Sequence, residues 1–448
     1  MSNLENYMKQ QAIFCEQNDS ISKNLYSEYG VKRGLRDEKG QGVLTGLTNI
    51  SDIKAFEYHD GVKSPCDGEL SYRGYNIKDL VTGSKGKRFI FEEGAYLLLF
   101  GELPTDTQLM EFQGRLSDCM ELPTNFTRDV IMKAPTSDIM GSMTRSILTL
   151  GSYDKEKESL EIPNVLRQSM QLIAVFPMLA VYAYHAYCHY EKNESMYIHR
   201  PEKDLSIAEN FLRLLRPDTK FTELEARVLD IALLLHMEHG GGNNSTFTTR
   251  VVTSSGSDTY SVISAAMSSL KGKKHGGANL MVMNMMDDIK SHVKDYEDEE
   301  EIASYLSKIL KKEAFDQKGL IYGMGHAVYS ISDPRERVFK GFVEQLARDK
   351  GREKDMTLYN NIEKIAPKLI AKQRQIFKGV SPNIDFYSGF VDDMLNIPRE
   401  LYTPLFAIAR IAGWSAHRLE ELITKDKIIR PAYKSLVSKK EYIEREER

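Results

Sequence analysis

Residues 323–337, GMGHAVYSISDPRER, combine a histidine between small residues with an arginine that follows a proline. Glycines beside His326 permit a tight chain path and the close approach of a ligand. The DPRE run is typical of a helix start, with Asp333 as the N-cap residue and Glu336 closing a capping box. Arg335 would add a positive charge to backbone N–H groups that already attract anions. The segment favours an imidazole beside a carboxylate or phosphate site, although a capped helix after a loop would explain the same residues.

A second histidine cluster lies in HMEHGGGNNSTFTTR, residues 236–250. His236 and His239 are three residues apart and could share one helix face, so a metal-binding pair is one interpretation. No acidic or cysteine partner follows at ligand spacing, and residues 240–242 are three glycines typical of a helix stop. A structural histidine at a helix end is therefore the favoured interpretation.

His275 comes just before an apolar segment of helical periodicity in KKHGGANLMVMNMM, residues 273–286. A helix N-terminus would lower the pKa of this imidazole from its usual value of ~6.5 and favour the neutral form. A neutral histidine can donate a hydrogen bond to a developing oxyanion. A helix-capping histidine is the alternative.

Asp385 lies in the turn-rich segment SPNIDFYSGF, residues 381–390, between Ile384 and Phe386. If these apolar neighbours exclude water, the pKa of the carboxyl group rises from ~3.9 and the aspartate becomes a better general base. A loop aspartate that accepts hydrogen bonds from nearby backbone N–H groups would have the same local sequence.

Arg410 is an isolated charge in an almost wholly apolar segment between Leu401 and Ala416. A helix that is apolar all round is buried, and a buried guanidinium group needs an anionic partner. The positions three and four residues away hold Phe406, Ala407, Gly413 and Trp414, none of them acidic. A bound carboxylate would supply the missing charge.

The elements that must position these residues are mainly helices. The length of 448 residues predicts two lobes or one large multi-helix body. Helical periodicity covers residues 91–100, 228–236, 261–270, 278–293, 301–311, 334–347 and 398–423, whereas residues 42–58 and 68–72 are the best strand segments. The polar first 40 residues predict an arm or peripheral helices, and residues 152–163 predict a charged surface insertion.

Composition excludes several classes of protein. Sixty basic and 64 acidic residues give a net charge of −4, which argues against binding to nucleic acid or anionic membranes through net charge. The four cysteines form no C-x-x-C motif, so reduced thiols in a cytoplasmic protein are expected. The N-terminus shows no secretory signal, and the longest apolar run, residues 172–184, is shorter than a membrane span and predicts a buried helix.

Six segments in order resemble the citrate synthase family, from about Gly42 to Tyr433. They are GELSYRGYNIKDL with FEEGAYLLLFGELPT, HMEHGGGNNST, HGGAN, GMGHAVY followed by DPR, PNIDFYSG, and the helix that carries Arg410. No one motif is decisive, but their order and separations make coincidence very improbable.

The resemblance implies an all-α, two-domain homodimer with little β structure. Residues 1–40 would form an N-terminal arm, 41–284 and 391–448 a large domain, and 285–390 a small domain that closes over the substrates. It also implies condensation of an acyl-CoA, usually acetyl-CoA, with oxaloacetate, followed by thioester hydrolysis, with no metal or redox cofactor.

The same resemblance implies roles for individual residues. Asp385 would deprotonate the thioester methyl group, His275 would hydrogen-bond the enolate oxygen, and His326 would protonate the oxaloacetate ketone. Oxaloacetate would be held by His239, Arg335, Arg410 and, from the neighbouring subunit, Arg430. Ser245 would orient His275, and Lys318, Arg374 and Lys378 would contact the phosphates of CoA.

Some positions depart from the family pattern, including Ala327, where many bacterial relatives have an arginine that can contact CoA. Two alternatives to a citrate synthase remain open at this stage. A 2-methylcitrate synthase would use propionyl-CoA, and one extra methylene shifts selectivity by only ~1–3 kcal/mol, so no single residue decides between them. A non-catalytic binding protein on the same fold is the other alternative.

Overall fold

The computed structural model describes residues 2–375, 379–424 and 427–448, and the chain forms two compact units, Met1–Leu47 and Thr48–Arg448. Helices make up 58% of the structure and strands 6%. The predicted all-α fold is therefore confirmed. The predicted division of the chain at residues 285 and 390 stays a prediction.

The first unit contains α1 (Asn3–Asp19), α2 (Asn24–Glu28) and a 3-10 turn at Arg33–Leu35. A capping box opens α1, because Ser2 Oγ accepts a hydrogen bond from the Glu5 backbone and the Glu5 side chain accepts one from the Ser2 backbone. Helix α1 buries none of its residues.

The second unit is built from fifteen α-helices within the described residues. They are α3 (Ile77–Thr82), α4 (Ile90–Phe100), α5 (Asp106–Asp118), α6 (Ile139–Tyr153), α7 (Ile162–Lys192), α8 (Ile207–Leu215), α9 (Glu223–His236), α10 (Asn244–Ser254), α11 (Thr259–Leu270), α12 (Ala278–His292), α13 (Glu299–Leu310), α14 (Pro334–Asp349), α15 (Glu353–Arg374), α16 (Asp385–Met394) and α17 (Tyr402–Thr424).

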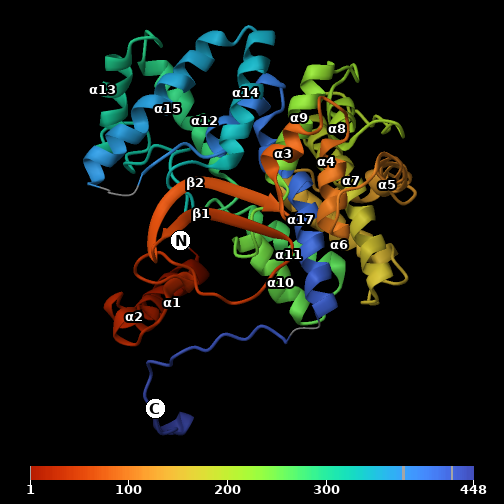
Figure 1. Cartoon of the computed structure of the whole chain (residues 1–448). Coiled ribbons are helices and arrows are strands. Elements are labelled where there is room, and N and C mark those ends of the chain that lie inside the picture. Colours follow the sequence, from red (N-terminus) through yellow and green to blue (C-terminus); the bar gives the residue numbers. More distant parts are fainter. Residues whose placement is uncertain (1, 376–378, 425–426) are drawn as a thin grey trace. The chain divides into compact units, whose positions relative to one another are not determined.

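Helix α17 lies at the centre of this unit and packs against α4, α7, α9, α10 and α11 (Figure 1). Most of its residues are buried, as its apolar sequence predicts. Helix α7 is also mostly buried and contains the apolar run at residues 172–184. It is long and apolar enough to cross a membrane, but 78% of its most apolar 18-residue window is buried inside the structure, which makes it a core helix.

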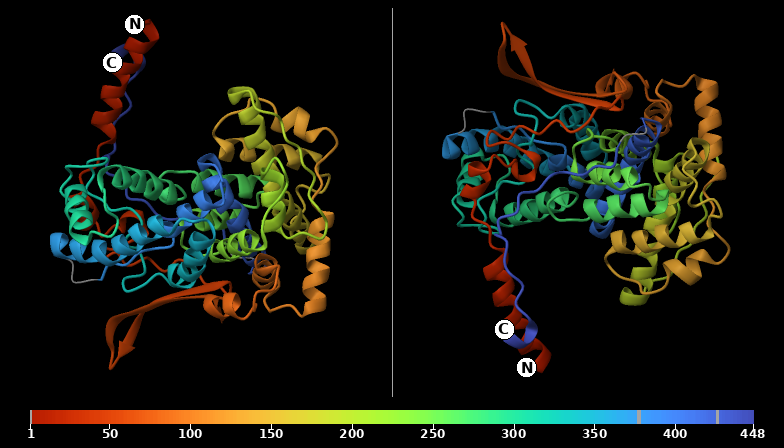
Figure 2. Two further views of the ribbon diagram at one scale, coloured as in Figure 1. Left: turned by 90° about the horizontal axis from the view of Figure 1, so that it is seen from above. Right: turned by 90° about the horizontal axis from the view of Figure 1, so that it is seen from below.

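A three-stranded antiparallel sheet, ordered β1-β2-β3, accompanies the helices: β1 (Ser51–His59), β2 (Val62–Tyr72) and β3 (Tyr75–Asn76). Asp60 and Gly61 form a two-residue turn with positive φ at both positions, which suits a right-twisted hairpin. Figure 2 shows the β1–β2 tip projecting away from the helices. Near its other end, Gly68 donates its N–H to Ser332 Oγ (3.1 Å), so the hairpin supports the segment that leads into α14.

All seven predicted helical segments are helical, with α9 beginning five residues earlier than predicted and α17 four residues later. The predicted strand at 42–58 is only partly correct, because its strand begins at Ser51. The 152–163 segment is not simply a charged surface insertion. Asp154 accepts hydrogen bonds from Arg167, Gln168 and Tyr260, and this network ties the segment to α7 and α11.

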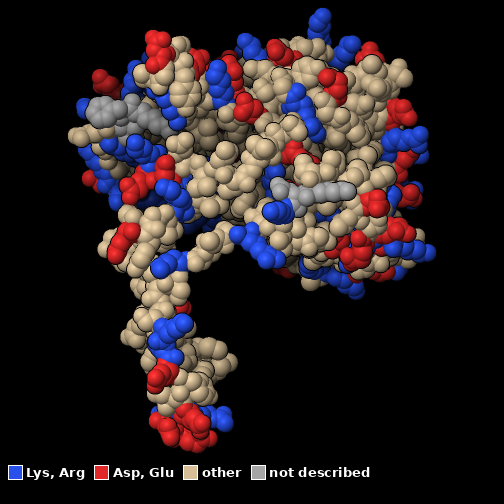
Figure 3. All heavy atoms as spheres, turned by 60° about the horizontal axis from the view of Figure 1, so that its bottom comes forward, with Lys and Arg blue, Asp and Glu red and all other residues tan. Residues whose placement is uncertain are grey.

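Basic and acidic side chains are interspersed on the face of the molecule in Figure 3. This mixture agrees with the small net charge of −4. The chemistry of the protein must therefore be sought in local arrangements of charged groups.

Candidate active site

Two glycine-rich and turn-rich segments far apart in the sequence lie side by side at the candidate site. Residues 323–325 and 381–383 pair in antiparallel fashion through a β-bridge. Gly325 donates its N–H to the Ser381 carbonyl (2.8 Å), and the Asn383 side chain donates to the Gly325 carbonyl (2.7 Å). These bonds fix the loop that carries His326 against the turn that leads to Asp385.

Glycine is required at position 323 for two reasons. Its φ is 86°, in the left-handed region that favours glycine. A Cβ atom there would lie 2.9 Å from Phe386 Cδ2 and 3.1 Å from Phe386 Cα. The predicted tight chain path at this glycine is therefore confirmed, with the backbone packed against α16 immediately beside Asp385. The predicted close approach of a ligand stays a prediction.

His326 and His239 face each other across the site, with 3.2 Å between their Nε2 atoms. The Nδ1 atom of His326 accepts the backbone N–H groups of Val328 (3.0 Å) and Tyr329 (3.2 Å), so in the neutral ring the proton is on Nε2. His239 Nε2 then accepts a hydrogen bond from His326 Nε2. Burial, together with the positive charge of Arg335, holds the pKa of His239 well below its usual value, which keeps this ring neutral.

Arg335 lies in the first turn of α14, as predicted, but its guanidinium group is already paired. Asp333 accepts hydrogen bonds from Arg335 Nε (3.1 Å) and Nη2 (3.0 Å) and also from the Arg335 backbone N–H. Both side chains are buried. Asp333 is therefore the N-cap that the sequence predicts and also the residue that fixes the arginine.

The predicted capping box at Glu336 is wrong. The N-cap interaction of α14 comes from Asp333 alone, and Glu336 is buried against Glu363. Burial and the nearby Glu363 carboxylate raise the pKa of Glu336 to about 9, so Glu336 is protonated at neutral pH.

Asp385 is the first residue of α16, which corrects its predicted position in a loop. Burial raises the pKa of its carboxyl group to about 6, and Asp333 adds to this increase, whereas Arg335 and Arg410 oppose it. The predicted direction is thus confirmed. No described residue donates a hydrogen bond to the carboxylate, which leaves it available to a ligand.

His275 and Ser245 are in contact, as the resemblance implied. Ser245 Oγ lies 2.8 Å from His275 Nε2, and the Ser245 backbone N–H donates to the same nitrogen at 3.3 Å. Nε2 is therefore an acceptor, and the proton is on Nδ1. Trp414, in α17, donates its indole N–H to Ser245 Oγ (3.2 Å), which fixes the serine in turn.

The pKa of His275 falls to about 4, in the predicted direction but for a different reason. The main cause is burial, followed by the positive charge of Arg410. Helix α12 begins three residues later, at Ala278. The ring is neutral at physiological pH and can donate a hydrogen bond from Nδ1.

Arg410 is buried, as predicted, and its Nε donates to the His236 carbonyl at 2.8 Å. Its guanidinium carbon lies 4.6 Å from the centre of the Phe406 ring, a cation–π contact. Across the described ranges no carboxylate oxygen lies within 4.0 Å of it. Burial lowers the pKa of Arg410 to about 10, while the negative charge of Glu238 opposes this decrease.

His236 has a structural role, in agreement with the interpretation favoured from the sequence. Its Nδ1 donates to the Ala232 carbonyl (2.8 Å), and its ring packs against Phe406. The described part of the chain contains no group of three His, Cys, Asp or Glu side chains placed to bind a metal ion.

The residues predicted to bind CoA, and Arg430, make no contact with the other site residues within the described chain. Lys318 and Arg374 are exposed. Arg374 Nη2 donates to the carbonyl of Gly319 (3.3 Å), the residue after Lys318, so the two basic residues lie near each other. Lys378 lies outside the described residues. Arg430 is exposed in the segment after α17, and within the described chain it makes no hydrogen bond or ion pair with a site residue.

Sequence reasoning did not assign a role to Tyr329, whose ring lies 4.6 Å from His326 and 5.5 Å from His239, centre to centre. Its hydroxyl group is buried without a partner among the described residues. The only local signal was its position three residues after His326. Its ring packs against both imidazole rings.

Comparisons with known proteins agree with this arrangement. The family described as "Citrate synthase, C-terminal domain" matches residues 38–432. Citrate synthase from Synechocystis sp. is 36% identical over 86% of this chain and 89% of its own length. A 2-methylcitrate synthase from Shewanella oneidensis is 34% identical over 81% of this chain and 87% of its own length.

Solved structures give the same result. Citrate synthase from Thermoplasma acidophilum, in a ternary complex with carboxymethyl coenzyme A and oxaloacetate, has a TM-score of 0.75 and 26% identity over 93% of this chain and 99% of that chain. Citrate synthase from Pyrobaculum aerophilum has a TM-score of 0.73 and 28% identity over 92% of this chain and 95% of that chain. From a family match over nearly the whole second unit and relatives of matching length and fold, we conclude that this chain belongs to the citrate synthase family of acyltransferases.

Proposed function

We propose that the protein condenses acetyl-CoA with oxaloacetate and hydrolyses the resulting thioester to citrate and CoA. The observation that supports this proposal is that Asp385, a carboxylate of raised pKa, interacts with two buried arginines, Arg335 and Arg410. The same arginines act on the neutral ring of His239, and Arg410 acts on that of His275. A base, two hydrogen-bond donors and two cations are the groups that an enolate condensation with a dicarboxylate requires.

In the first step Asp385 removes a proton from the methyl group of the acetyl thioester. A thioester methyl group is a very weak acid, so the enolate oxygen must be stabilised as the proton leaves. His275 donates the Nδ1 hydrogen bond to that oxygen. Since the ring is neutral, it stabilises the enolate without transferring a full charge, and Ser245 maintains the required tautomer.

In the second step the enolate carbon attacks the ketone carbon of oxaloacetate. The ketone oxygen takes the proton from His326 Nε2, the nitrogen that carries it in the neutral ring. Water then adds its hydroxide to the thioester carbonyl of the product and returns a proton to His326. Protonated Asp385 gives up the proton that it took from the methyl group, and CoA leaves as its thiol.

Arg335 and Arg410 bind the two carboxylates of oxaloacetate, together with His239. Arginine suits this role because its planar group donates two parallel hydrogen bonds to one carboxylate and stays charged. Asp333 uses Nε and one terminal nitrogen of Arg335, and the His236 carbonyl uses Nε of Arg410. The other terminal nitrogens are the groups that face the substrate.

The direct test of this proposal is the release of CoA thiol by the purified protein, with citrate identified as the product. Acetyl-CoA and oxaloacetate together should give steady turnover, and either substrate alone should give none. A protein that binds both substrates but releases no CoA would instead support a non-catalytic binding protein on this fold.

The second candidate is a 2-methylcitrate synthase, since relatives of that name match at 34% and 32% identity. Comparing kcat/KM for acetyl-CoA and propionyl-CoA at a fixed oxaloacetate concentration separates the two. A higher value for propionyl-CoA would assign the chain to 2-methylcitrate synthesis.

We further propose a cytoplasmic homodimer that needs no metal or redox cofactor, with Arg430 reaching the partner's site and with Lys318 and Arg374 contacting CoA phosphates. The support for Arg430 is its exposure after α17 and its lack of contact with the site of its own chain. Mixed dimers of Arg430→Ala and Asp385→Asn subunits test the cross-subunit role. They should regain one working site, and complete inactivity after demonstrated subunit exchange would refute it.

A further inference from the structure

A buried carboxylate, Glu238, precedes His239 in the chain and has no part in the steps above. Glu238 and its partner His417 both have an exposed fraction of 0%. Burying a carboxylate is costly unless it is paired and hydrogen-bonded, so its presence beside the site calls for a role.

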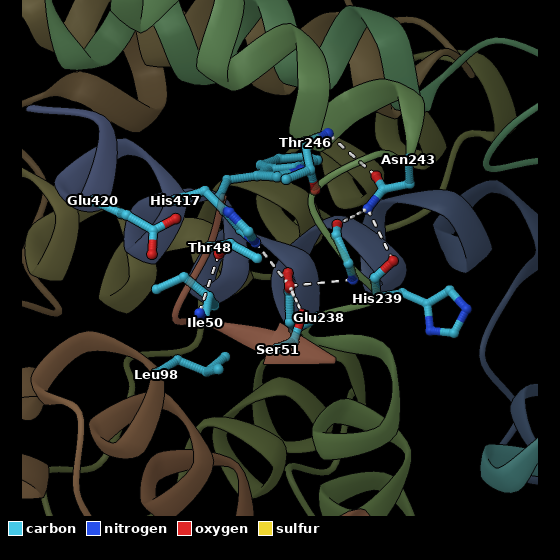
Figure 4. Close-up of polar contacts among 12 residues, drawn as sticks. Thr48, Ile50, Ser51, Leu98, Glu238, His239, Asn243, Thr246, His417 and Glu420 are labelled. Atoms are coloured by element: carbon cyan, nitrogen blue, oxygen red, sulfur yellow. Dashed lines mark hydrogen bonds and ion pairs between the residues drawn. The ribbon is translucent and has the colours of Figure 1, made fainter. Parts of the chain in front are cut away.

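Three donors converge on one oxygen of Glu238. His417 Nε2 lies 2.7 Å from Glu238 Oε2, Ser51 Oγ donates to it at 2.5 Å, and the Gly240 N–H donates to it at 3.2 Å (Figure 4). Burial alone would raise the pKa of Glu238, but the interactions with His417 and Ser51 outweigh it and hold that pKa below its usual value. The carboxylate is therefore ionised.

These contacts fix the chain on both sides of His239. The Gly240 N–H is held in a turn with φ of 83°, and the Glu238 carbonyl accepts a hydrogen bond from the Tyr72 hydroxyl (3.3 Å). In Figure 4 the His239 ring points away from Glu238. The backbone is thus anchored behind the ring, and the ring meets His326 at 3.2 Å.

One face of helix α17 lies close to the Glu238 carboxylate. Arg410, Gly413 and His417 are spaced three and four residues apart and share one helix face. A Cβ atom at Gly413 would lie 2.3 Å from the Met237 carbonyl oxygen and 2.8 Å from Glu238 Oε1. Glycine at this position lets α17 approach closely enough for His417 to reach Glu238.

Glu238 is also the acid with the largest influence on Arg410. Among the charged groups around this guanidinium, Glu238 contributes most to keeping it protonated, and Arg410 in turn helps to keep Glu238 ionised. The two side chains do not form an ion pair. The fixed negative charge therefore stabilises Arg410 while leaving its terminal nitrogens available to a substrate carboxylate.

We propose that Glu238, held by His417 and Ser51, is a positioning residue for oxaloacetate. It fixes the turn that directs His239 into the site, and it places a fixed negative charge near the guanidinium group of Arg410. The inference rests on the proposed function, because it assigns the oxaloacetate subsite of that same reaction.

The test uses Glu238→Gln, which keeps the size of the side chain and removes its charge. Trp414, the one tryptophan in the chain, contacts Ser245, and we expect its fluorescence to change when oxaloacetate binds. We expect the Kd and KM for oxaloacetate to rise about 10- to 100-fold, because Arg410 loses the nearby negative charge and the turn before His239 loses its carboxylate acceptor. The KM for acetyl-CoA should change less than about twofold.

The matched control is Glu225→Gln, which removes another buried carboxylate with Arg216 and Lys350 as partners, away from the site. It should lower the thermal stability without changing the KM for oxaloacetate. A structural role for Glu238 would make the two variants behave alike.

Three further variants keep the test decisive if Glu238→Gln does not fold. His417→Gln retains a side-chain N–H near the position of Nε2 and should rescue oxaloacetate binding relative to His417→Leu, which cannot donate. Ser51→Ala removes one donor and should raise the KM for oxaloacetate about two- to fivefold.

The inference is overturned if the variants that fold leave the KM for oxaloacetate within twofold of the wild-type value, or raise both KM values equally. Failure of the proposed function is a separate result, since it would appear in the wild-type protein as an absence of CoA release.

Discussion

Both carboxylate oxygens of Asp333 accept hydrogen bonds from the guanidinium group of Arg335, and Asp333 Oδ2 also accepts the backbone N–H of Ile384 at 3.1 Å. One buried side chain thus joins the start of α14 to the start of α16. Because Asp385 follows Ile384 directly, the arginine proposed to bind oxaloacetate and the aspartate proposed to act as base depend on the same carboxylate for their positions.

Replacing Asp333 with asparagine should therefore affect both binding and stability. The amide nitrogen cannot accept the Arg335 and Ile384 hydrogen bonds, and a buried arginine loses its counter-charge. We expect the Kd for oxaloacetate to rise about 10- to 100-fold and the free energy of unfolding to fall by about 3–5 kcal/mol. Trp414 fluorescence titration and urea unfolding measure the two effects.

The control is Asp298→Asn at the exposed N-cap of α13. It should cost about 1 kcal/mol or less, because asparagine is also a good N-cap, and should not affect oxaloacetate binding. Equal effects of the two substitutions would show that Asp333 acts only as a helix cap.

Substitutions at Gly323 and Gly325 test how the segment before His326 packs against the start of α16, where Asp385 lies. Gly323 and Gly325 both have φ of 86°, so alanine at either position is strained by about 1–2 kcal/mol. Only at Gly323 does the added Cβ meet Phe386, whereas at Gly325 nothing lies within 4 Å. Gly323→Ala should lower Tm further than Gly325→Ala and displace the start of α16. Thermal unfolding compares them, and indistinguishable Tm values would contradict the packing described here.

The pH dependence of activity follows from the raised pKa of Asp385. The base must be ionised, and burial raises its pKa to about 6, so kcat/KM should fall as the pH drops below about 6. An ordinary aspartate would keep its activity to about pH 4. His275 is neutral down to about pH 4 and should add no transition near pH 6.5. Initial rates between pH 5 and 9 measure the profile, and a constant kcat/KM down to pH 5 would refute this assignment.

The same raised pKa predicts an effect on stability. A carboxyl group whose pKa is higher in the folded state favours folding in its protonated form, and that contribution is lost as the pH rises through about 6. Asp385→Asn should therefore be more stable than the wild type at pH 7, on the order of 1–3 kcal/mol, and the gain should disappear near pH 4. Urea unfolding at both pH values tests the sign, and a less stable variant at pH 7 would reverse it.

Ser245→Ala should reduce kcat while leaving the KM for oxaloacetate nearly unchanged. The substitution removes the hydroxyl group that contacts His275 Nε2 and accepts the Trp414 N–H, so the imidazole loses part of its orientation. We expect a decrease of about 10- to 100-fold in kcat. Thr246→Val is the control, because the neighbouring Thr246 hydroxyl is buried without a partner among the described residues. Similar kcat values for the two variants would exclude an orienting role for Ser245.

Much of the helical architecture could be predicted from the sequence, because the 3.6-residue period and the Asp-Pro start of α14 are local signals. The burial of Arg410 was also predictable, since its helix is apolar on every side. Helix α7 was recognised only through its central apolar run. Its ends carry polar and charged residues, so local hydropathy did not reveal its full length.

Contacts between distant segments could not be predicted in this way. The pairing of residues 323–325 with 381–383 links positions nearly sixty residues apart, and no local pattern encodes it. Asp333 was expected as an N-cap, but its hold on Arg335 depends on the burial of both side chains. The lowered pKa of His275 was predicted from the wrong cause, because its burial and the nearby Arg410 arise only in the folded protein.

The central claim is that Asp385 performs the proton abstraction that starts the condensation of acetyl-CoA with oxaloacetate. The most direct measurement is hydrogen–deuterium exchange of the acetyl methyl group and release of CoA, in wild type and Asp385→Asn, with oxaloacetate binding followed through Trp414. The account predicts that the variant still binds oxaloacetate but loses CoA release by about 10²- to 10⁴-fold. Near-normal turnover by Asp385→Asn would contradict it.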